Sequence, residues 1–239
     1  FIKGFFAGAA PLPMDTYNRL IELTGKQIVD VYGLTECTLF ATASPWRGKI
    51  KAGTVGLPLP NTEIKIVDLE TGQKEMPAGE AGEILIKGPQ VMSGYYKKPE
   101  ETAQVLCDGW LCTGDIGFID EEGYLSVIDR KKDLIIAGGF NVYPNEVDDV
   151  LFAHPKVKEA CTVGMPDAYR GETVVAYVVA NPGERVTEEE IKKHCRENLA
   201  AYKVPRKIFF IDELPKSSIG KILRRELRAR AAESARSES

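Results

Sequence analysis

Residues 32–36 read Tyr-Gly-Leu-Thr-Glu and follow an apolar run. They bring a hydroxyl, on Thr35, next to a carboxylate, on Glu36. The Thr35 hydroxyl can donate a hydrogen bond to a phosphate oxygen, and the Glu36 carboxylate can hold Mg²⁺, which prefers oxygen ligands. Gly33, directly after Tyr32, leaves space beside the backbone for a ligand. The same residues could equally begin a short helix, because Thr is a favoured N-cap. The pattern therefore indicates either phosphate-and-metal chemistry or helix initiation.

A second acidic side chain, Asp115, ends the glycine-bracketed segment 109–115. A carboxylate at the end of a strand can accept two hydrogen bonds from a ribose diol, as the acidic residue of dinucleotide folds does. Taken alone, an Asx-type turn explains Asp115 better. This segment therefore adds a candidate ribose contact.

A lysine, Lys221, lies in segment 214–222 among small and flexible residues. Such residues predict an exposed loop before a terminal helix. A lysine cation there could neutralise a carboxylate and the charge that develops on a phosphorus under attack. A solvated surface lysine is the usual alternative.

Two clusters of small residues follow predicted strands. Gly8, Ala9 and Ala10 come after an apolar run, and Gly138 and Gly139 come after another. Small residues at a strand end let the backbone approach a ligand closely, and nucleotide pockets in open α/β sheets lie at such ends. A tight turn explains each cluster when it is considered alone.

Strands and helices that would position these residues follow from the hydrophobic periodicity. Five consecutive charges at 129–133 separate two predicted strands, so the chain must surface there, either as a solvated hairpin turn or as an interdomain linker. A Thr-Glu-Glu-Glu capping box opens the helix at residue 187. We expect strands at 2–7, 27–31, 62–67, 82–87, 124–128, 134–137, 157–165 and 173–179, helices at 14–23, 145–152 and 187–199, and a basic C-terminal helix that frays from 234 to 239.

Composition narrows the function classes. The 239 residues are 44% hydrophobic and carry a net charge of −4, so nucleic acid is not an expected partner. No apolar run approaches the roughly 18 residues needed to span a bilayer. The five cysteines show no CxxC spacing, which is typical of free thiols in a cytoplasmic protein. Two histidines are too few for a histidine-rich metal site.

Taken together, the motifs resemble those of the adenylate-forming enzymes, which include acyl-CoA synthetases, firefly luciferase and peptide-synthetase adenylation domains. The matching stretches are YGLTE at 32–36, TGD at 113–115, the charged segment 128–135, the glycine loop at 138–139 and PKSSIGK at 215–221. They occur in the family's order and most resemble the C-terminal half of a long- or medium-chain fatty-acid–CoA ligase. The family's glycine-rich phosphate loop is absent, which implies a C-terminal fragment that is inactive alone.

The resemblance implies a role for each candidate residue. In the nucleotide site, Tyr32, Gly33 and Thr35 would contact AMP, Glu36 would hold Mg²⁺, Gly8, Ala9 and Ala10 would contact adenine, and Asp115 and Arg130 would bind the ribose. In the rest of the chain, Lys132 would be the hinge, Gly138 and Gly139 would line the pantetheine tunnel of coenzyme A, and Lys221 would drive adenylation.

The resemblance also implies a mixed α/β and α+β fold. Residues 1–56 would end a large α/β nucleotide-binding subdomain, 57–130 would form a small β-barrel subdomain, and 131–239 a mobile α+β domain. The expected activity is that of an ATP-dependent, AMP-forming acid–thiol ligase, with ATP, Mg²⁺, a carboxylic acid and coenzyme A as ligands. An acyl-AMP ligase, a module that loads a carrier protein, and a non-catalytic binding fragment remain open, as do peripheral membrane contact and a homodimer.

Overall fold

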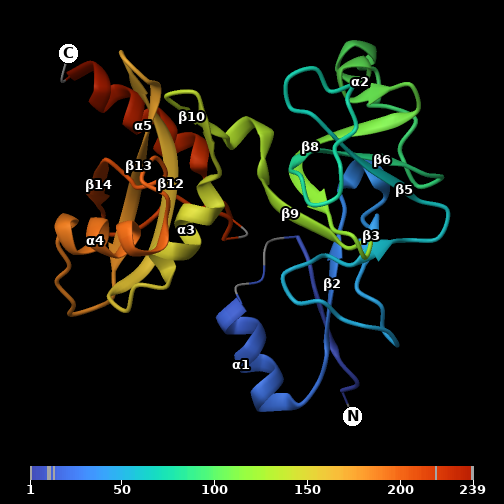
Figure 1. Ribbon diagram of the computed structural model, residues 1–239, viewed down its shortest axis with the longest axis horizontal. Coiled ribbons are helices and arrows are strands. Elements are labelled where there is room, and N and C mark those ends of the chain that lie inside the picture. Colours follow the sequence, from blue (N-terminus) through green and yellow to red (C-terminus); the bar gives the residue numbers. More distant parts are fainter. Residues whose placement is uncertain (1, 10–11, 13, 219, 238–239) are drawn as a thin grey trace. The chain divides into compact units, whose positions relative to one another are not determined.

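The computed structural model describes residues 2–9, 12, 14–218 and 220–237 (Figure 1). These residues form a mixed α/β structure with three sheets. The chain divides into two compact units, Phe1–Lys131 and Lys132–Ser239. Among the described helices, none has the length and apolar character needed to cross a membrane.

The first sheet of unit 1 has the strand order β1-β2-β3-β4. Its parallel pair, β1 (Phe5–Ala7) and β2 (Ile28–Tyr32), is joined by helix α1 (Met14–Thr24), while β3 (Thr42–Ala43) and β4 (Leu57–Pro58) add antiparallel strands. Because β1 and β2 run in the same direction, the residues that follow each strand emerge at the same edge of the sheet.

The second sheet of unit 1 is antiparallel and centres on the long strand β8 (Trp110–Ile119). Its neighbours are β6 (Gly82–Lys87), β7 (Leu106–Cys107) and β9 (Leu125–Arg130), and β5 (Glu63–Val67) pairs with β6. Helix α2 (Pro99–Val105) begins with Pro at its first turn, where no backbone donor is needed. One buried cluster joins the two sheets of unit 1; it includes Cys37, Ala41, Ile84, Ile86, Leu111 and Leu125.

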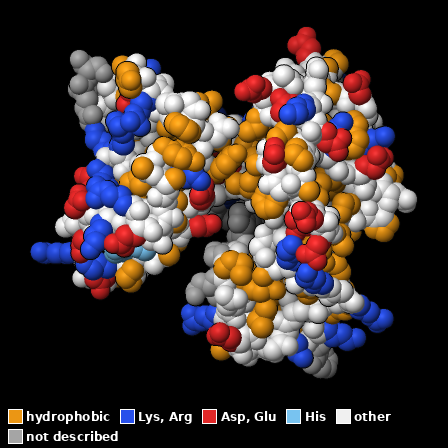
Figure 2. Space-filling model, viewed as in Figure 1, with side chains coloured by type: hydrophobic (Ala, Val, Ile, Leu, Met, Phe, Trp, Pro, Cys, Tyr) orange, Lys and Arg blue, Asp and Glu red, His pale blue; other side chains and the backbone are white. Residues whose placement is uncertain are grey.

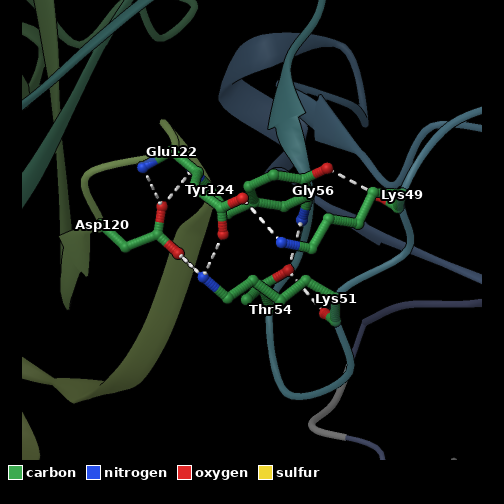
Figure 3. Close-up of polar contacts among 7 residues, drawn as sticks. All are labelled: Lys49, Lys51, Thr54, Gly56, Asp120, Glu122 and Tyr124. Carbon is green, nitrogen blue, oxygen red and sulfur yellow. Dashed lines mark hydrogen bonds and ion pairs between the residues drawn. The ribbon is translucent and has the colours of Figure 1, made fainter.

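A polar cluster fixes segment 49–56 against the turn between β8 and β9 (Figure 3). Lys51 bonds both Asp120 and Glu122, Lys49 bonds Glu122 at 2.6 Å, and the Tyr124 hydroxyl donates to the carbonyl of Lys49 at 2.6 Å. Backbone bonds continue the connection, since Val55 donates to the Leu125 carbonyl and Leu125 to that of Gly56. Strand β9 is therefore tied to the segment that connects β3 and β4 of the first sheet.

Unit 2 contains a five-stranded sheet of order β11-β10-β13-β12, with β14 also paired to β13. The strands are β10 (Ile135–Ala137), β11 (Phe140–Val142), β12 (Val157–Asp167), β13 (Gly171–Ala180) and β14 (Lys207–Phe210). The helices are α3 (Pro144–Phe152), α4 (Glu188–Asn198) and α5 (Arg224–Ser237).

Alternation along β13 places helices on both faces of this sheet. Val174, Ala176 and Val178 belong to a core that includes residues of α3 and α4. Val175 and Tyr177 belong to a second core that includes Leu227 and Ala231 of α5. Figure 1 shows α5 and α4 flanking these strands.

Several expected elements are confirmed within a few residues, and two expectations need correction. Strand β9 extends past residue 128 to Arg130, and Asp129 within it is only 3% exposed, so the chain does not surface until the short helix η2 (Lys131–Asp133). Helix α5 continues to Ser237, past the start of the fraying expected from 234, and the Ser234 hydroxyl donates to the carbonyl of Arg230. Residues 238 and 239 of the expected frayed tail lie outside the described residues. Figure 2 shows acidic and basic side chains intermixed on the visible face of each unit.

Candidate functional site

The ends of β1 and β2 bring two of the predicted clusters to one edge of the first sheet. Phe5–Ala7 pairs in parallel with Ile28–Asp30, so Gly8 and Ala9 follow β1 beside the end of β2. A Cβ on Gly8 would lie 2.7 Å from a methyl carbon of Val31, so a side chain there would force this region to shift. Ala10, the third residue of the predicted adenine contact, lies outside the described residues.

Gly33 permits a close approach of one backbone segment to another. A Cβ there would lie 2.1 Å from the carbonyl oxygen of Leu39, and Ala41 donates a hydrogen bond to the carbonyl of Tyr32 at 2.8 Å. The chain therefore folds back directly after Thr35–Cys37, which forms the short 3-10 helix η1. Thr35 begins a helical turn, as one interpretation expected, although the N-cap of η1 is Leu34. The Thr35 side chain is exposed, and its contact with a phosphate stays a prediction.

Asp115 lies on a β-bulge that its own motif creates. Glu83 of β6 pairs with Ile116, but Leu85 pairs with Cys112, so β8 contains extra residues between these positions. Gly114 adopts a left-handed φ of 70°, which favours glycine. Bulges re-aim side chains and are common next to active sites. The Thr-Gly-Asp segment thus forms the bulge that places the Asp115 carboxylate.

Two side chains hold the Asp115 carboxylate. The Tyr32 hydroxyl donates to Oδ2 at 2.9 Å, and the Nε of Arg130, its cross-strand neighbour, lies 3.3 Å from Oδ1. Asp115 is 5% exposed. Burial, and then the adjacent negative charge of Asp115, raise the pKa of Tyr32, so this hydroxyl stays protonated and remains a donor. Two motifs 83 residues apart are thereby joined.

Glu83 supports the bulge and was assigned no chemistry from the sequence. Its Oε1 accepts a hydrogen bond from the Gly114 backbone at 3.2 Å, and its Oε2 pairs with Lys131 at 2.7 Å. The side chain is 9% exposed. A charged residue inside the apolar strand Gly82–Lys87 was the available signal, since a buried carboxylate needs a partner.

Tyr95 is the second residue whose contact was not foreseen. Its hydroxyl donates to Oε1 of Glu36 at 2.7 Å. Among the described residues no group of three or more His, Cys, Asp or Glu could hold a metal ion. A single carboxylate suits Mg²⁺, which binds one or two protein carboxylates and completes its octahedron with water and substrate phosphates. Glu36 therefore fits Mg²⁺ better than a metal that requires several protein ligands.

In unit 2, the loop that carries Lys221 is held through its backbone. Ser217 donates to the carbonyl of Lys221 at 2.8 Å, and Leu223 donates to that of Pro215 at 2.8 Å. The Lys221 side chain is exposed and has no hydrogen-bond or ion-pair partner among the described residues. Its ammonium group is therefore available to a ligand.

Arg224 fixes the end of that loop at the start of α5. One guanidinium nitrogen donates to the Thr162 carbonyl at 2.7 Å, and the other bonds Asn145 at 2.6 Å and Asp148 at 2.9 Å. These partners belong to β12 and α3. The base of the loop is thus anchored to the sheet and to a helix, while its tip is exposed.

Gly138 and Gly139 form the two-residue turn between β10 and β11. Their φ angles of 62° and 85° are those of a type I′ hairpin turn, which requires left-handed residues at both positions. The turn lies at a cavity of about 760 Å³ within unit 2, whose lining includes Phe140, Tyr202, Arg170 and Arg206. Phe140 and Tyr202 stack with centroids 4.8 Å apart. The cavity thus offers an aromatic wall and two cations.

The predicted residues fall into two groups. Gly8, Ala9, Tyr32, Gly33, Thr35, Glu36, Asp115 and Arg130 belong to unit 1. Lys132, Gly138, Gly139 and Lys221 belong to unit 2, where Lys132 is an exposed residue of η2 at the unit boundary.

Known proteins match this chain along most of its length. The AMP-binding enzyme model matches residues 2–96, and the AMP-binding enzyme C-terminal domain model matches residues 146–221. The long-chain-fatty-acid–CoA ligase of Bacillus subtilis is 49% identical over 226 residues, which make up 95% of this chain and 40% of that protein. The chain thus spans about 40% of the length of the curated relatives it matches.

Solved structures match it closely as well. The ATP-bound crystal structure of MatB from Rhodopseudomonas palustris has a TM-score of 0.89 and 40% identity, over 95% of this chain and 45% of that one. The o-succinylbenzoate–CoA synthetase of Bacillus subtilis, in complex with ATP and a magnesium ion, has a TM-score of 0.82 and 38% identity, over 93% of this chain and 45% of that one.

Proposed function

We propose that this chain is part of an ATP-dependent acid–thiol ligase that forms acyl-CoA from a fatty acid. The premise is that the chain belongs to the AMP-binding enzyme family. The observation that carries the proposal is the contact between two motifs: the Tyr32 hydroxyl bonds the Asp115 carboxylate, which also pairs with Arg130. A carboxylate held in this way is suited to accept hydrogen bonds from a ribose diol.

The first half-reaction would activate the acid. An oxygen of the fatty-acid carboxylate attacks the α-phosphorus of ATP, the bond to pyrophosphate breaks, and acyl-adenylate forms. Asp115 and Arg130 orient the ribose, and the backbone at Gly8 and Ala9 faces the adenine. The Thr35 hydroxyl donates to the α-phosphate, for which its exposure at the start of η1 is suitable.

Charge control of this step falls to Glu36 and Lys221. Glu36 would hold Mg²⁺, which would supply positive charge at the phosphates. Lys221 places an ammonium beside the attacking carboxylate and the α-phosphate, where it stabilises the charge that develops in the transition state. Its exposed side chain and its backbone-held loop support this role.

The second half-reaction would transfer the acyl group to coenzyme A. The thiolate attacks the acyl carbonyl, and AMP leaves. The Gly138–Gly139 turn would line the path of the pantetheine arm, which the cavity of about 760 Å³ beside it supports. We propose that residues 131–239 rotate about Lys132 between the half-reactions, a hinge movement of a familiar kind. The large subdomain would then end near residue 56, and 57–130 would form a barrel-like subdomain.

A long-chain fatty acid is the substrate we favour, because the curated relatives at 46–49% identity are long-chain-fatty-acid–CoA ligases. A cytoplasmic location accords with the five free cysteines. Peripheral membrane contact would suit a fatty-acid substrate, and a homodimer stays a prediction.

The second candidate is a ligase that passes the acyl group to a carrier protein. One observation argues against an acyl-AMP ligase that cannot use coenzyme A. Between Lys132, in η2, and Gly138 lie only the end of η2 and the three-residue strand β10. No insertion is therefore present there to restrain the hinge.

The proposal is tested with the full-length protein by fatty-acid-dependent exchange of pyrophosphate into ATP, followed by addition of coenzyme A or a phosphopantetheinyl carrier protein. We expect exchange that requires Mg²⁺ and product formation with coenzyme A. Product with the carrier protein alone would favour the second candidate. Absence of exchange, together with no Mg²⁺-dependent ATP binding by calorimetry, would show a non-catalytic protein.

A further inference from the structure

Three hydrogen bonds join segment 88–96 to η1 and to Thr38, the residue that follows it. The Met92 backbone donates to the Glu36 carbonyl at 2.7 Å, and the Thr38 hydroxyl donates to the Gln90 carbonyl at 2.8 Å. The Tyr95 hydroxyl donates to Oε1 of Glu36 at 2.7 Å. Both the backbone and the side chain of Glu36 are thus fixed by one segment that lies far along the chain.

Tyr95 is itself held by the start of α2. Its backbone N–H donates to the Thr102 hydroxyl at 2.9 Å, and its carbonyl accepts from Lys98 at 3.1 Å. The Thr102 hydroxyl in turn donates to the Lys98 carbonyl at 2.7 Å. A Cβ on Gly94 would lie 2.8 Å from a methyl carbon of Thr102, so the preceding glycine lets the two segments meet. These contacts give Tyr95 a defined backbone position.

The phenol is suited to be a permanent donor. Its hydroxyl is the donor and Oε1 of Glu36 the acceptor in the 2.7 Å hydrogen bond. The neighbouring Tyr96 differs. This residue is 85% exposed, and the Lys97 ammonium lies 5.2 Å from the centroid of its ring. The chain therefore offers two adjacent tyrosines, of which one contacts Glu36.

We propose that Tyr95 is a positioning residue for the metal-dependent step. It holds Oε1 of Glu36 and so leaves Oε2, which has no hydrogen-bond partner among the described residues, as the metal-binding oxygen in a single carboxylate orientation. The inference rests on the proposed function of Glu36. Replacing a residue that orients a metal ligand typically costs about 10- to 100-fold in metal affinity. A carboxylate that is already fixed loses less rotamer freedom on binding the metal.

The test uses the full-length protein with Tyr95→Phe, which removes only the hydroxyl, and Tyr96→Phe as the matched control. Binding of Mn²⁺, a paramagnetic substitute for Mg²⁺, is measured by electron paramagnetic resonance with a non-hydrolysable ATP analogue. The half-saturating Mg²⁺ concentration is measured by pyrophosphate exchange. We expect Tyr95→Phe to weaken Mn²⁺ binding and raise the Mg²⁺ requirement about tenfold, and Tyr96→Phe to change neither.

Glu36→Gln provides the second test. If Tyr95 acts through Glu36, Tyr95→Phe has no further effect on Mn²⁺ binding in the Glu36→Gln background. The inference would be overturned by unchanged Mn²⁺ binding in Tyr95→Phe, or by equal losses in the two tyrosine variants. In either case, Mg²⁺-dependent exchange by the unsubstituted protein would still uphold the proposed function. An unsubstituted protein without Mg²⁺-dependent exchange would overturn both.

Discussion

The Asp115 carboxylate and the Lys221 ammonium are held in opposite ways. Asp115 is 5% exposed, lies on a bulge in a central strand and bonds two side chains. Lys221 is exposed, and its loop is fixed by backbone bonds at its base. Groups that bind a ligand gain from being oriented beforehand, whereas a group needed in one step of two gains from remaining unattached. The proposed function uses this difference, because Asp115 is oriented before a nucleotide binds, whereas the Lys221 ammonium remains available for one step.

The largest effect is expected from Lys221→Ala. If Lys221 stabilises the adenylation transition state, its loss lowers the rate of acyl-adenylate formation by roughly 10²- to 10³-fold, as removal of one transition-state donor does elsewhere. Thioester formation from supplied acyl-adenylate should survive. The two half-reactions are measured separately in the full-length protein.

Lys216→Ala is the control for this prediction, because Lys216 belongs to the same loop but pairs with Glu159 at 2.7 Å. Equal loss of both half-reactions in Lys221→Ala, or an equal adenylation defect in Lys216→Ala, would contradict the assigned role.

The next effect is expected from Asp115→Asn. The amide keeps the shape but loses the charge that strengthens hydrogen bonds to a ribose, so the KM for ATP rises by about 10-fold or more. Steady-state kinetics at saturating fatty acid measure it. Asp108→Asn is the control, since Asp108 lies exposed in the β7–β8 turn, where asparagine tolerates its φ of 51°. A KM unaltered by Asp115→Asn would remove Asp115 from the site.

Tyr32→Phe sharpens the comparison by removing one bond within unit 1. The Asp115 carboxylate loses its 2.9 Å donor but keeps Arg130, so we expect a rise of a few-fold in the KM for ATP. In a double-mutant cycle with Asp115→Asn, the two effects should be non-additive because the residues touch. Strict additivity would show that the hydroxyl acts elsewhere.

The smallest effect concerns stability in unit 2. The Thr187 backbone N–H, and then Lys156, hold the pKa of Glu190 at about 2, below its ordinary value of 4.5. A carboxyl whose folded pKa is lowered stabilises the fold above pH 4.5, and this contribution is lost as the pH falls towards 2. Glu190→Gln should therefore lower Tm by a degree or two, roughly, at pH 7, and the difference should shrink towards pH 3.

Thermal unfolding from pH 7 to pH 3 measures this difference. Glu189→Gln is the control, because Glu189 lies in the same helical turn and pairs with the exposed Arg196 but takes no part in the capping box. A Glu190→Gln deficit that is constant with pH would show that the capping box does not act through its charge.

Local patterns in the sequence predicted much of the fold. The capping box at Thr187 and Glu190 is confirmed, as are the strand Gly82–Lys87 and the helix that begins at Met14. These features depend on neighbours within a few residues. The two- and four-residue strands β7 and β14 were not predicted, because such short elements form only where a longer strand pairs with them.

Contacts between distant residues explain what the sequence could not give. The motifs indicated Thr35, Glu36 and Asp115 as candidates, but not that the Tyr32 hydroxyl would bond Asp115 across 83 residues. The bond from Tyr95 to Glu36 spans 59 residues. Spacing along the chain carries no signal for such pairs. The first joins strands β2 and β8 of the two sheets of unit 1, and the second joins η1 to segment 88–96.

The most direct test of the central claim is a crystal structure of the full-length protein with AMP. The account predicts ribose hydroxyls about 2.7–3.0 Å from the Asp115 carboxylate, with the phosphate at the Thr35 hydroxyl. A nucleotide bound elsewhere, with Asp115 still contacting only protein side chains, would contradict it.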